Sequence, residues 1–258
     1  MTMTDHQRYL FDLQGYVVIP DALSPDHVRE LNALMDARIA ADCDADMRTH
    51  RWVGMLDWGE PCRRLIDVDT VLPSIEALVG GQFRLDHEYA DVTRAGKGPI
   101  GTTLHAGPLP FNPCFYYKCD GESFANGLIS VAYNLRDVNE GDGGFGCLPG
   151  SHKSNIEMPE SMRHLDDAHA RVDRVTGAAG TAVVFTEALI HGTLPWAGAD
   201  ERRTLFYKYS PHALSWAAGY YDANAYDDLS DRQRAALEAP NARYGGKDGV
   251  TFGGVNNG

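Results

Sequence analysis

The sequence has few cysteines, no long hydrophobic run and a shortage of basic side chains, and each shortage excludes a class of protein. The five cysteines are odd in number and include no C-x-x-C pair, so neither a disulfide framework nor a zinc ribbon is indicated. No apolar stretch approaches the roughly 20 residues of a membrane span. The formal net charge of −13 argues against nucleic acid or an anionic membrane as a partner.

Motifs of several common enzyme classes are also missing. The glycine-rich stretch "EGDGGFGCLPG" is not followed by G-K-[ST], and "GAAGTAVVF" precedes a predicted strand instead of following one. There is no G-x-S-x-G elbow and no H-E-x-x-H helix. The N-terminal segment lacks the basic start and apolar run of a signal peptide, so we expect a cytoplasmic protein.

Helices are predicted mainly before residue 82. In the segment 24–42, Ser24 is suited to the N-cap and Pro25 to the first helical position, and apolar residues recur at helical spacing. A second helix is predicted over 69–79, ended by two glycines, and a late one within 229–240. We expect these helices to cover one face of a β structure.

From residue 82 onward, short segments rich in β-branched and aromatic residues alternate with Gly, Pro and Asn/Asp. Many short strands without intervening helices favour an antiparallel sandwich or barrel over a parallel sheet. The expected class is therefore mainly β with flanking helices (α+β). We expect one domain over 1–258, with a helical cover at about 1–81, a barrel core at about 82–212, and a C-terminal helix and tail at 213–258.

Two histidines occupy similar settings and are candidate metal ligands. His105 in "TTLHAGP" and His191 in "EALIHGTLPW" each end an apolar run and are closely followed by Gly and Pro. Imidazoles at strand ends can converge on one metal even when they are far apart in the sequence. Arg202 begins the next predicted strand, where its guanidinium could bind a carboxylate in bidentate fashion, and Thr193 could add a hydroxyl.

Three segments, in order, resemble the phytanoyl-CoA dioxygenase family of iron(II)- and 2-oxoglutarate-dependent oxygenases. They are "FDLQGYVVIPDALSPDHVREL", "VAYNLRDVNEGDGGFGCLPGSHKSN" and "GTAVVFTEALIHGTLPWAGADERRTLFYKYSP". The resemblance covers most of residues 8–212. It implies a double-stranded β-helix, also called a jelly-roll or cupin-like barrel. It also implies iron(II), 2-oxoglutarate and O2 as cofactors and cosubstrates, with iron held by two histidines and one carboxylate.

The resemblance assigns a role to each matching position. His105 matches the first histidine ligand, and His191 matches the distal one. Arg202 matches the arginine that pairs with the far carboxylate of 2-oxoglutarate, with Thr193 as the small hydroxyl residue beside it. Tyr133 falls where family members often carry an aromatic residue against the cosubstrate. The turn "PGSHK" at 149–153 is interpreted as structural.

The sequence departs from the family at Gly107, where the carboxylate of the H-x-D motif belongs. One hypothesis is a halogenase-like site, in which chloride takes the open position and the substrate is chlorinated. A second is hydroxylation, with the acid supplied by Asp120 or Glu122 of the following loop or with water in the open position. A third is a non-catalytic protein that binds a metal or small acid. We prefer a two-histidine site and place hydroxylation ahead of chlorination.

The substrate is only broadly indicated. The stretch "CFYYKC" places Tyr116, Tyr117 and Lys118 near the predicted iron loop, and His87 and Tyr89 share one face of a predicted strand. These residues favour a small, polar molecule as the substrate. The sequence leaves the identity of that molecule and the oligomeric state open.

Overall fold

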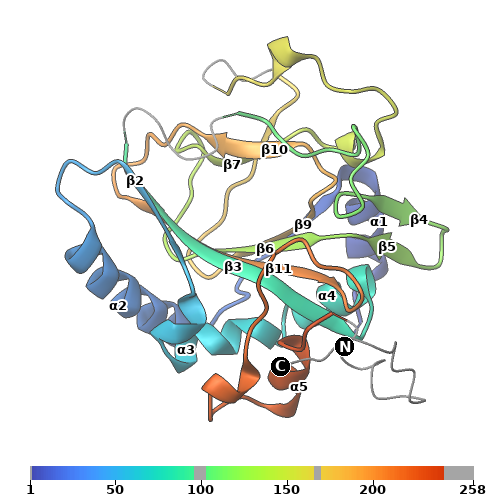
Figure 1. The fold of residues 1–258 in the computed structure, drawn as a ribbon. Helices are drawn as coiled ribbons and strands as arrows, with labels where there is room; N and C mark the ends of the chain where they lie inside the picture. Colours follow the sequence, from blue (N-terminus) through green and yellow to red (C-terminus); the bar gives the residue numbers. More distant parts are fainter. Residues whose placement is uncertain (1, 96–102, 166–169, 241–258) are drawn as a thin grey trace.

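The computed structural model describes residues 2–95, 103–165 and 170–240. Two antiparallel sheets face each other, and helices cover the outer face of the larger sheet (Figure 1). The predicted class, mainly β with flanking helices, is confirmed. The fold places a cavity between the two sheets, and this cavity contains both candidate histidines.

The larger sheet holds the strands in the order β1-β9-β6-β11-β3-β2, and every neighbouring pair in it is antiparallel. Its strands are β1 (Tyr16–Ile19), β2 (Thr49–Val53), β3 (Phe83–Thr93), β6 (Ile129–Asn134), β9 (Ala182–Thr186) and β11 (Arg202–Pro211). The smaller sheet has the order β10-β7-β8, and a separate hairpin pairs β4 with β5. Their bounds are β4 (Tyr117–Cys119), β5 (Phe124–Asn126), β7 (Gly144–Cys147), β8 (Asp173–Arg174) and β10 (His191–Leu194).

The helices begin and end where local sequence signals indicate. The Ser24 side chain accepts a hydrogen bond from the His27 amide, and Pro25 occupies the first turn of α2 (Pro25–Asp42). Gly80 ends α4 (Leu72–Val79). The other α-helices are α1 (Asp5–Gln14), α3 (Glu60–Arg63) and α5 (Asp231–Ala236). The 3₁₀ helices are η1 (Met55–Trp58), η2 (Arg64–Asp67), η3 (Ser151–Lys153), η4 (Glu160–Met162) and η5 (Ala223–Ala225).

The central strand β11 divides its side chains between two environments. Leu205, Tyr207 and Tyr209 point to the side of the helices and belong to the main apolar core. Phe206 and Lys208 point to the opposite side and line the cavity between the sheets. Because side chains of a strand alternate between its faces, one ten-residue strand supports both the core and the candidate site.

The region before residue 82 contributes more than a helical cover. β1 pairs with β9 at one edge of the larger sheet, and β2 pairs with β3 at the other. The segment 47–67 therefore supplies an edge strand as well as η1 and α3. The start of the predicted strand at 100–107 and the predicted tail at 241–258 lie outside the described residues, and the single-domain division stays a prediction.

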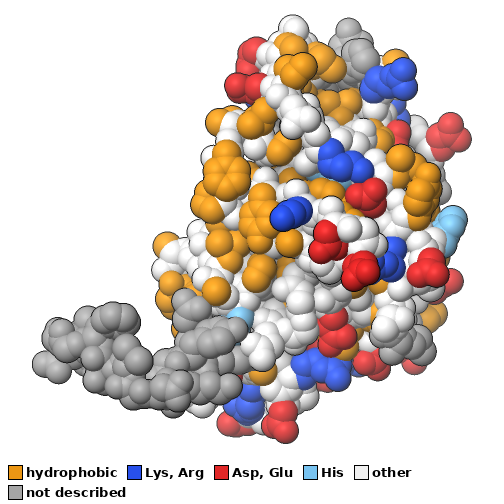
Figure 2. Space-filling view, turned by 90° about the vertical axis from the view of Figure 1, so that its right-hand side faces the viewer, with side chains coloured by type: hydrophobic (Ala, Val, Ile, Leu, Met, Phe, Trp, Pro, Cys, Tyr) orange, Lys and Arg blue, Asp and Glu red, His pale blue; other side chains and the backbone are white. Residues whose placement is uncertain are grey.

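No helix in the described ranges is long and apolar enough to cross a membrane. On the face shown in Figure 2, basic side chains stand among acidic and hydrophobic ones and do not form a continuous basic surface. The mixed charge on this face agrees with the acidic composition of the chain.

Candidate active site

His105 and His191 are direct partners across an antiparallel bridge. The His105 amide donates to the His191 carbonyl oxygen at 2.9 Å, and the His191 amide donates to the His105 carbonyl oxygen at 3.1 Å. Their ring centroids are 4.5 Å apart. Reciprocal backbone hydrogen bonds fix two residues opposite each other. The fold thus brings together two imidazoles that are far apart in the sequence.

Both imidazoles present the same nitrogen to the cavity. His191 Nδ1 lies 2.7 Å from the Leu189 carbonyl oxygen, and His105 Nδ1 lies 3.0 Å from the Thr103 carbonyl oxygen. A carbonyl only accepts, so Nδ1 donates in each neutral ring and Nε2 keeps its lone pair. Burial also lowers the pKa of His191 to about 4, against the opposing effect of Glu187. His191 is therefore a neutral imidazole at neutral pH, the form that binds a metal.

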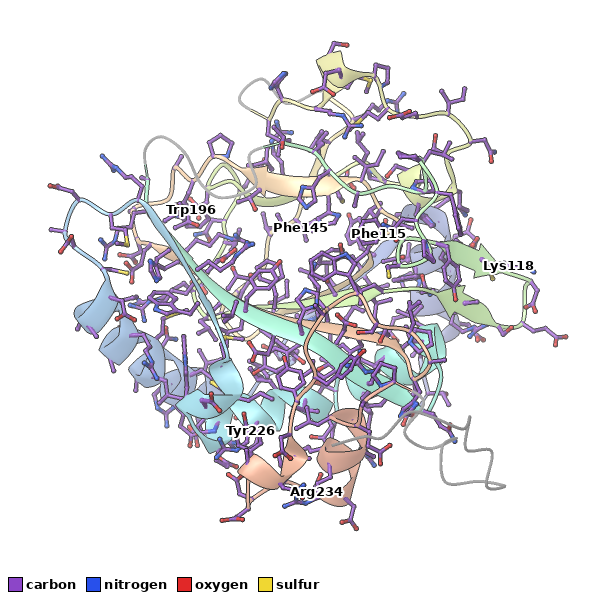
Figure 3. All side chains as sticks on the ribbon, viewed as in Figure 1. Phe115, Lys118, Phe145, Trp196, Tyr226 and Arg234 are labelled. Atoms are coloured by element: carbon purple, nitrogen blue, oxygen red, sulfur yellow. The ribbon has the colours of Figure 1, made fainter. Side chains whose placement is uncertain are left out.

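The cavity around the two rings has a volume of about 420 Å³. Aromatic side chains form much of its wall, and Phe115 and Phe145 lie between the two sheets (Figure 3). Near-parallel rings continue along the wall from Trp216 through His87 and Tyr89 to Phe206. This volume and an apolar lining with a few polar groups are typical of a small-molecule site.

A charged pair stands on the β2 side of this cavity. Arg51 donates from Nε and Nη2 to the two oxygens of Asp91, each at 2.7 Å. The Arg51 guanidinium also lies 4.1 Å from the centre of the Tyr89 ring. Both oxygens of the Asp91 carboxylate accept these hydrogen bonds, so Asp91 is paired with Arg51.

Arg202 is a buried cation whose Nε has no hydrogen-bond partner among the described residues. Its exposed fraction is 3%, its Nε lacks a hydrogen bond, and its guanidinium forms no ion pair with the residues that the structure describes. Burial lowers the pKa of Arg202, but a guanidinium stays protonated in proteins. A Cβ at Gly144 would stand 3.1 Å from Arg202 Nε, so the glycine leaves room beside the guanidinium. On the facing sheet, Thr193 lines the cavity. Arg202 is not itself among the residues that line the cavity, so its buried positive charge lies beside Gly144 and behind the cavity wall.

A second buried ion pair lies next to His191. Lys208 Nζ donates to Glu187 Oε1 at 2.8 Å, and Ser130 Oγ donates to the same oxygen. Burial would raise the pKa of Glu187, but Lys208 and His191 outweigh this effect and lower the pKa to about 2. The other oxygen, Oε2, accepts no hydrogen bond from a described residue and lies 4.0 Å from His191 Nε2. An ionised carboxylate oxygen therefore faces the metal-binding nitrogen.

A side chain at position 107 would be strained by its backbone and crowded by Ile190. The φ of Gly107 is +104°, and that of Ala106 is +62°, so the backbone turns sharply after His105. A Cβ on Gly107 would lie 2.9 Å from Ile190 Cγ1. Ile190 packs with Leu104 and other apolar residues in a separate cluster, not in the cavity. Any residue other than glycine at position 107 would therefore press on this cluster.

Two other predicted site residues lie away from the cavity. Tyr133 is fully buried in the main core on the helix side of β6, so the predicted contact with a cosubstrate does not fit this structure. Asp120 is exposed in the turn between β4 and β5, where the amides of Ser123 and Glu122 donate to it and lower its pKa. The prediction of Asp120 as an alternative ligand therefore does not fit either. Lys118 also extends outward from this hairpin (Figure 3).

In the ranges that the structure describes, no group of three or more His, Cys, Asp or Glu side chains is arranged to hold a metal ion. Among the described residues, the two imidazoles that line the cavity are the candidate metal ligands. This donor set suits a divalent transition metal that takes its remaining ligands from small molecules.

Comparison with known proteins shows what this chain resembles. Residues 111–204 match the model of the phytanoyl-CoA dioxygenase (PhyH) family. This part of the chain is similar to that family. Among curated proteins, the chain is 24% identical over 228 residues to L-proline trans-4-hydroxylase from Streptomyces griseoviridis, covering 76% of this chain and 82% of that protein.

Solved structures share the fold of this chain. HygX from Streptomyces hygroscopicus, with nickel and 2-oxoglutarate bound, superimposes with a TM-score of 0.75 at 21% identity, covering 86% of this chain and 97% of that chain. The 2-oxoglutarate-dependent epimerase SnoN from nogalamycin biosynthesis gives a TM-score of 0.58 at 18% identity, covering 80% and 81%. These likenesses establish a cupin-like fold.

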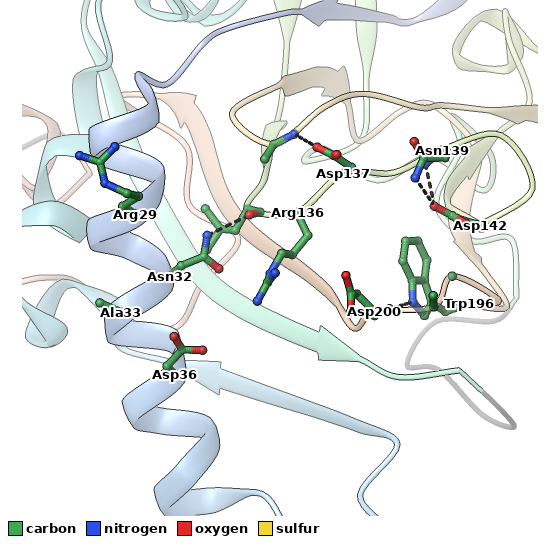
Figure 4. Close-up of a pocket in the computed structure, with 14 residues that line it drawn as sticks. Arg29, Asn32, Ala33, Asp36, Arg136, Asp137, Asn139, Asp142, Trp196 and Asp200 are labelled. Carbon is green, nitrogen blue, oxygen red and sulfur yellow. Dashed lines mark hydrogen bonds between the residues drawn. The ribbon is translucent and has the colours of Figure 1, made fainter.

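The protein also has a larger cavity, of about 650 Å³, beside α2 (Figure 4). Its wall includes Asn32 and Asp36 of α2 together with Arg136, Trp196 and Asp200 from loops. No histidine lines it, so the two-imidazole cavity remains the candidate active site.

Sequence reasoning missed Glu187 and Lys208. A signal for them existed, because each is a single charged residue inside an apolar stretch, "VVFTEALIH" and "TLFYKYS". Charged side chains are seldom buried unless they are paired. A search for isolated charges in strands would therefore have marked both residues as candidates for one ion pair.

Proposed function

We propose that the chain is an iron(II)- and 2-oxoglutarate-dependent oxygenase that hydroxylates an unactivated C–H bond of a small, polar molecule. The overall reaction converts R–H, 2-oxoglutarate and O2 into R–OH, succinate and CO2. The PhyH match, the proline hydroxylase relative and HygX with bound 2-oxoglutarate all support this class of reaction.

The buried, unpaired guanidinium of Arg202 carries the proposal. Burying a charge without a partner is costly, so such a group persists where it binds an anion. Arg202 projects from the same face of β11 as the cavity residues Phe206 and Lys208. The far carboxylate of 2-oxoglutarate is an anion of the right geometry for a guanidinium fork.

In this proposal, each site residue has a distinct role. His105 and His191 hold iron(II) through Nε2, and their Nδ1 hydrogen bonds to backbone carbonyls keep each ring in that orientation. Arg202 binds the far carboxylate of 2-oxoglutarate, and the Thr193 hydroxyl assists from the facing strand. The bound iron supplies the activation of O2. The aromatic wall excludes water and positions the substrate.

The cavity supports a polar small molecule as the substrate. Its aromatic wall provides contact area, while the Arg51–Asp91 pair offers hydrogen-bonding groups on one side. The proline hydroxylase relative acts on a molecule of this general kind. We place chlorination second, because the curated relative is a hydroxylase.

The test is succinate formation with iron(II), 2-oxoglutarate, O2 and a panel of polar small molecules. We expect succinate in the wild type and none in His191→Ala. A matched control is His164→Ala, which removes a histidine that lies outside the cavity lining. Binding of iron and 2-oxoglutarate without succinate under every condition would favour the non-catalytic binding protein instead. Equal iron binding by the wild type, His105→Ala and His191→Ala would overturn the assignment of the site.

A further inference from the structure

Glu187 places one carboxylate oxygen, Oε2, near the candidate metal position. Asp91, the other acid that lines the cavity, gives both of its oxygens to Arg51. Glu187 gives only Oε1 to Lys208 and Ser130, so Oε2 is left facing His191. The side chain is almost fully enclosed, with an exposed fraction of 4%. Solvent therefore does little to screen its charge from a neighbouring ion.

The distance between Glu187 and His191 decides what Glu187 can do. With metal–ligand bonds of roughly 2.1 Å, two ligands at a right angle stand about 3 Å apart. Glu187 Oε2 lies 4.0 Å from His191 Nε2, about 1 Å too far for that arrangement. A water molecule bound to the metal beside His191, however, would lie within hydrogen-bonding reach of Oε2. The geometry therefore favours an indirect contact through water.

We propose, in an inference that rests on the proposed function, that Glu187 controls the ligand position on the metal beside His191. Its Oε2 accepts a hydrogen bond from water at that position and repels chloride and other small anions. The site is thereby restricted to hydroxylation, because chlorination requires a halide on the metal. This role belongs to a positioning residue and does not depend on Gly107.

The charges around Glu187 agree with this role. Lys208 and Ser130 both contact Oε1, whereas Oε2 is the oxygen that lies 4.0 Å from His191 Nε2. They fix the carboxylate and neutralise part of its charge, but they leave Oε2 as the atom nearest the imidazole. A chloride ion beside His191 would contact Glu187 Oε2, not the Lys208 ammonium group. Two anions in such a dry location repel each other strongly.

The experiment uses the full chain loaded with cobalt(II) and 2-oxoglutarate, with visible absorption of the cobalt as the measurement. Chloride is titrated at constant ionic strength. We expect the wild-type spectrum to stay unchanged and the Glu187→Gln spectrum to shift with saturation, as chloride enters the metal's ligand set. Glu187→Asp keeps the charge and is expected to behave like the wild type.

A double variant distinguishes chloride binding at the metal from chloride binding at Lys208. Glu187→Gln alone leaves Lys208 unpaired, and that ammonium could attract chloride by itself. Glu187→Gln/Lys208→Met removes both charges and restores a neutral pair of similar volume. We expect this variant to show the same chloride-dependent cobalt spectrum, because the excluding carboxylate is gone.

The outcomes distinguish the two proposals. A chloride shift in wild-type protein, or none in either glutamine variant despite full cobalt binding, would overturn the role of Glu187 and leave the oxygenase proposal intact. If wild-type protein fails to bind cobalt, or binds it equally well after His191→Ala, the metal site itself is wrong and both proposals fall.

Discussion

Arg202 brings a positive charge into the interior without a partner, and this single residue links stability to cosubstrate binding. The cost of burying the charge is met only when an anion binds. Gly144 contributes by leaving space next to Nε. Free protein should therefore tolerate the loss of this charge better than the complex does.

Replacement of Arg202 by methionine tests this link. We expect Arg202→Met to unfold at the same or a higher temperature without ligand, because a costly buried charge is removed. Its affinity for 2-oxoglutarate should fall about 100-fold, in line with the loss of one partner of a buried charge pair. Thermal unfolding with and without 2-oxoglutarate measures both effects. An unchanged 2-oxoglutarate-induced shift would contradict the role of Arg202.

Gly107 provides a second test at the scale of one residue. Gly107→Asp should destabilise the protein by about 1–3 kcal/mol, because φ of +104° strains other residues and the new Cβ meets Ile190. It should not increase iron affinity. Gly107→Ala, which adds the Cβ without a carboxylate, is the matched control and should show a similar loss of stability. Tighter iron binding by the aspartate variant alone would show that residue 107 does reach the metal.

At the scale of elements, strand β3 connects the cavity with the helical side of the sheet. Tyr89 and Asp91 line the cavity, whereas Glu88 points to the opposite side. Burial raises the pKa of Glu88 to about 7, although the amides of Met55 and Leu56 in η1 oppose this effect. The packing of β3 against η1 is therefore sensitive to pH.

The direction of the Glu88 pKa shift predicts how the stability of the protein changes with pH. Since the folded-state pKa of Glu88 lies above its ordinary value of 4.5, its contribution to stability is present below that value and is lost as pH rises through about 7. Between about pH 5 and about pH 8, wild-type protein should lose up to about 3 kcal/mol more than Glu88→Gln. Urea unfolding of both proteins at the two pH values measures the difference. Parallel curves for the two proteins would refute the assignment to Glu88.

Elements with strong local signals were predictable from the sequence, and those that depend on tertiary pairing were not. Ser24, Pro25 and Gly80 mark helix ends through their own backbone preferences. The strand at 49–53 becomes part of a sheet only because β3 offers it an edge. Its own sequence, "THRWV", carries no strong alternation of apolar and polar residues.

The candidate site, too, was predictable only where local sequence carried a signal. The similar sequence settings of His105 and His191 were enough to suggest a common location. The orientation of Tyr133 was not predictable, because alternate residues of β6 point to opposite sides and only the register with β11 determines which side is the core. The environment of Gly107 depends on Ile190, which is distant in sequence. Glu187 acquires its importance from Lys208 and Ser130 on neighbouring strands.

At the scale of the whole molecule, the site lies where the two sheets face each other, so its ligands contact both. His191 and Thr193 come from the smaller sheet, and Arg202 comes from the larger one. A metal with 2-oxoglutarate would join the two layers. Binding should therefore stabilise the entire fold and not only the loops near the cavity.

We expect iron(II) or cobalt(II) with 2-oxoglutarate at about 100 times the dissociation constant to add about 2.7 kcal/mol to the free energy of unfolding. For a chain of this size, that is roughly 5–10 °C in unfolding temperature. A chelator should reverse the gain, and His191→Ala should show little of it. Differential scanning calorimetry, followed by the same scan after chelation, measures both. A gain of equal size in His191→Ala would place the metal elsewhere.

The reciprocal backbone hydrogen bonds between His105 and His191 have a kinetic consequence. They form an isolated bridge outside the regular strands, so each of the two amide protons is protected only while the bridge is closed. The rate at which these protons exchange with deuterium therefore reports how often the two imidazoles separate. A metal held by both rings would slow exchange at both positions together. The exchange rates of these two amides would therefore report whether the metal site is assembled.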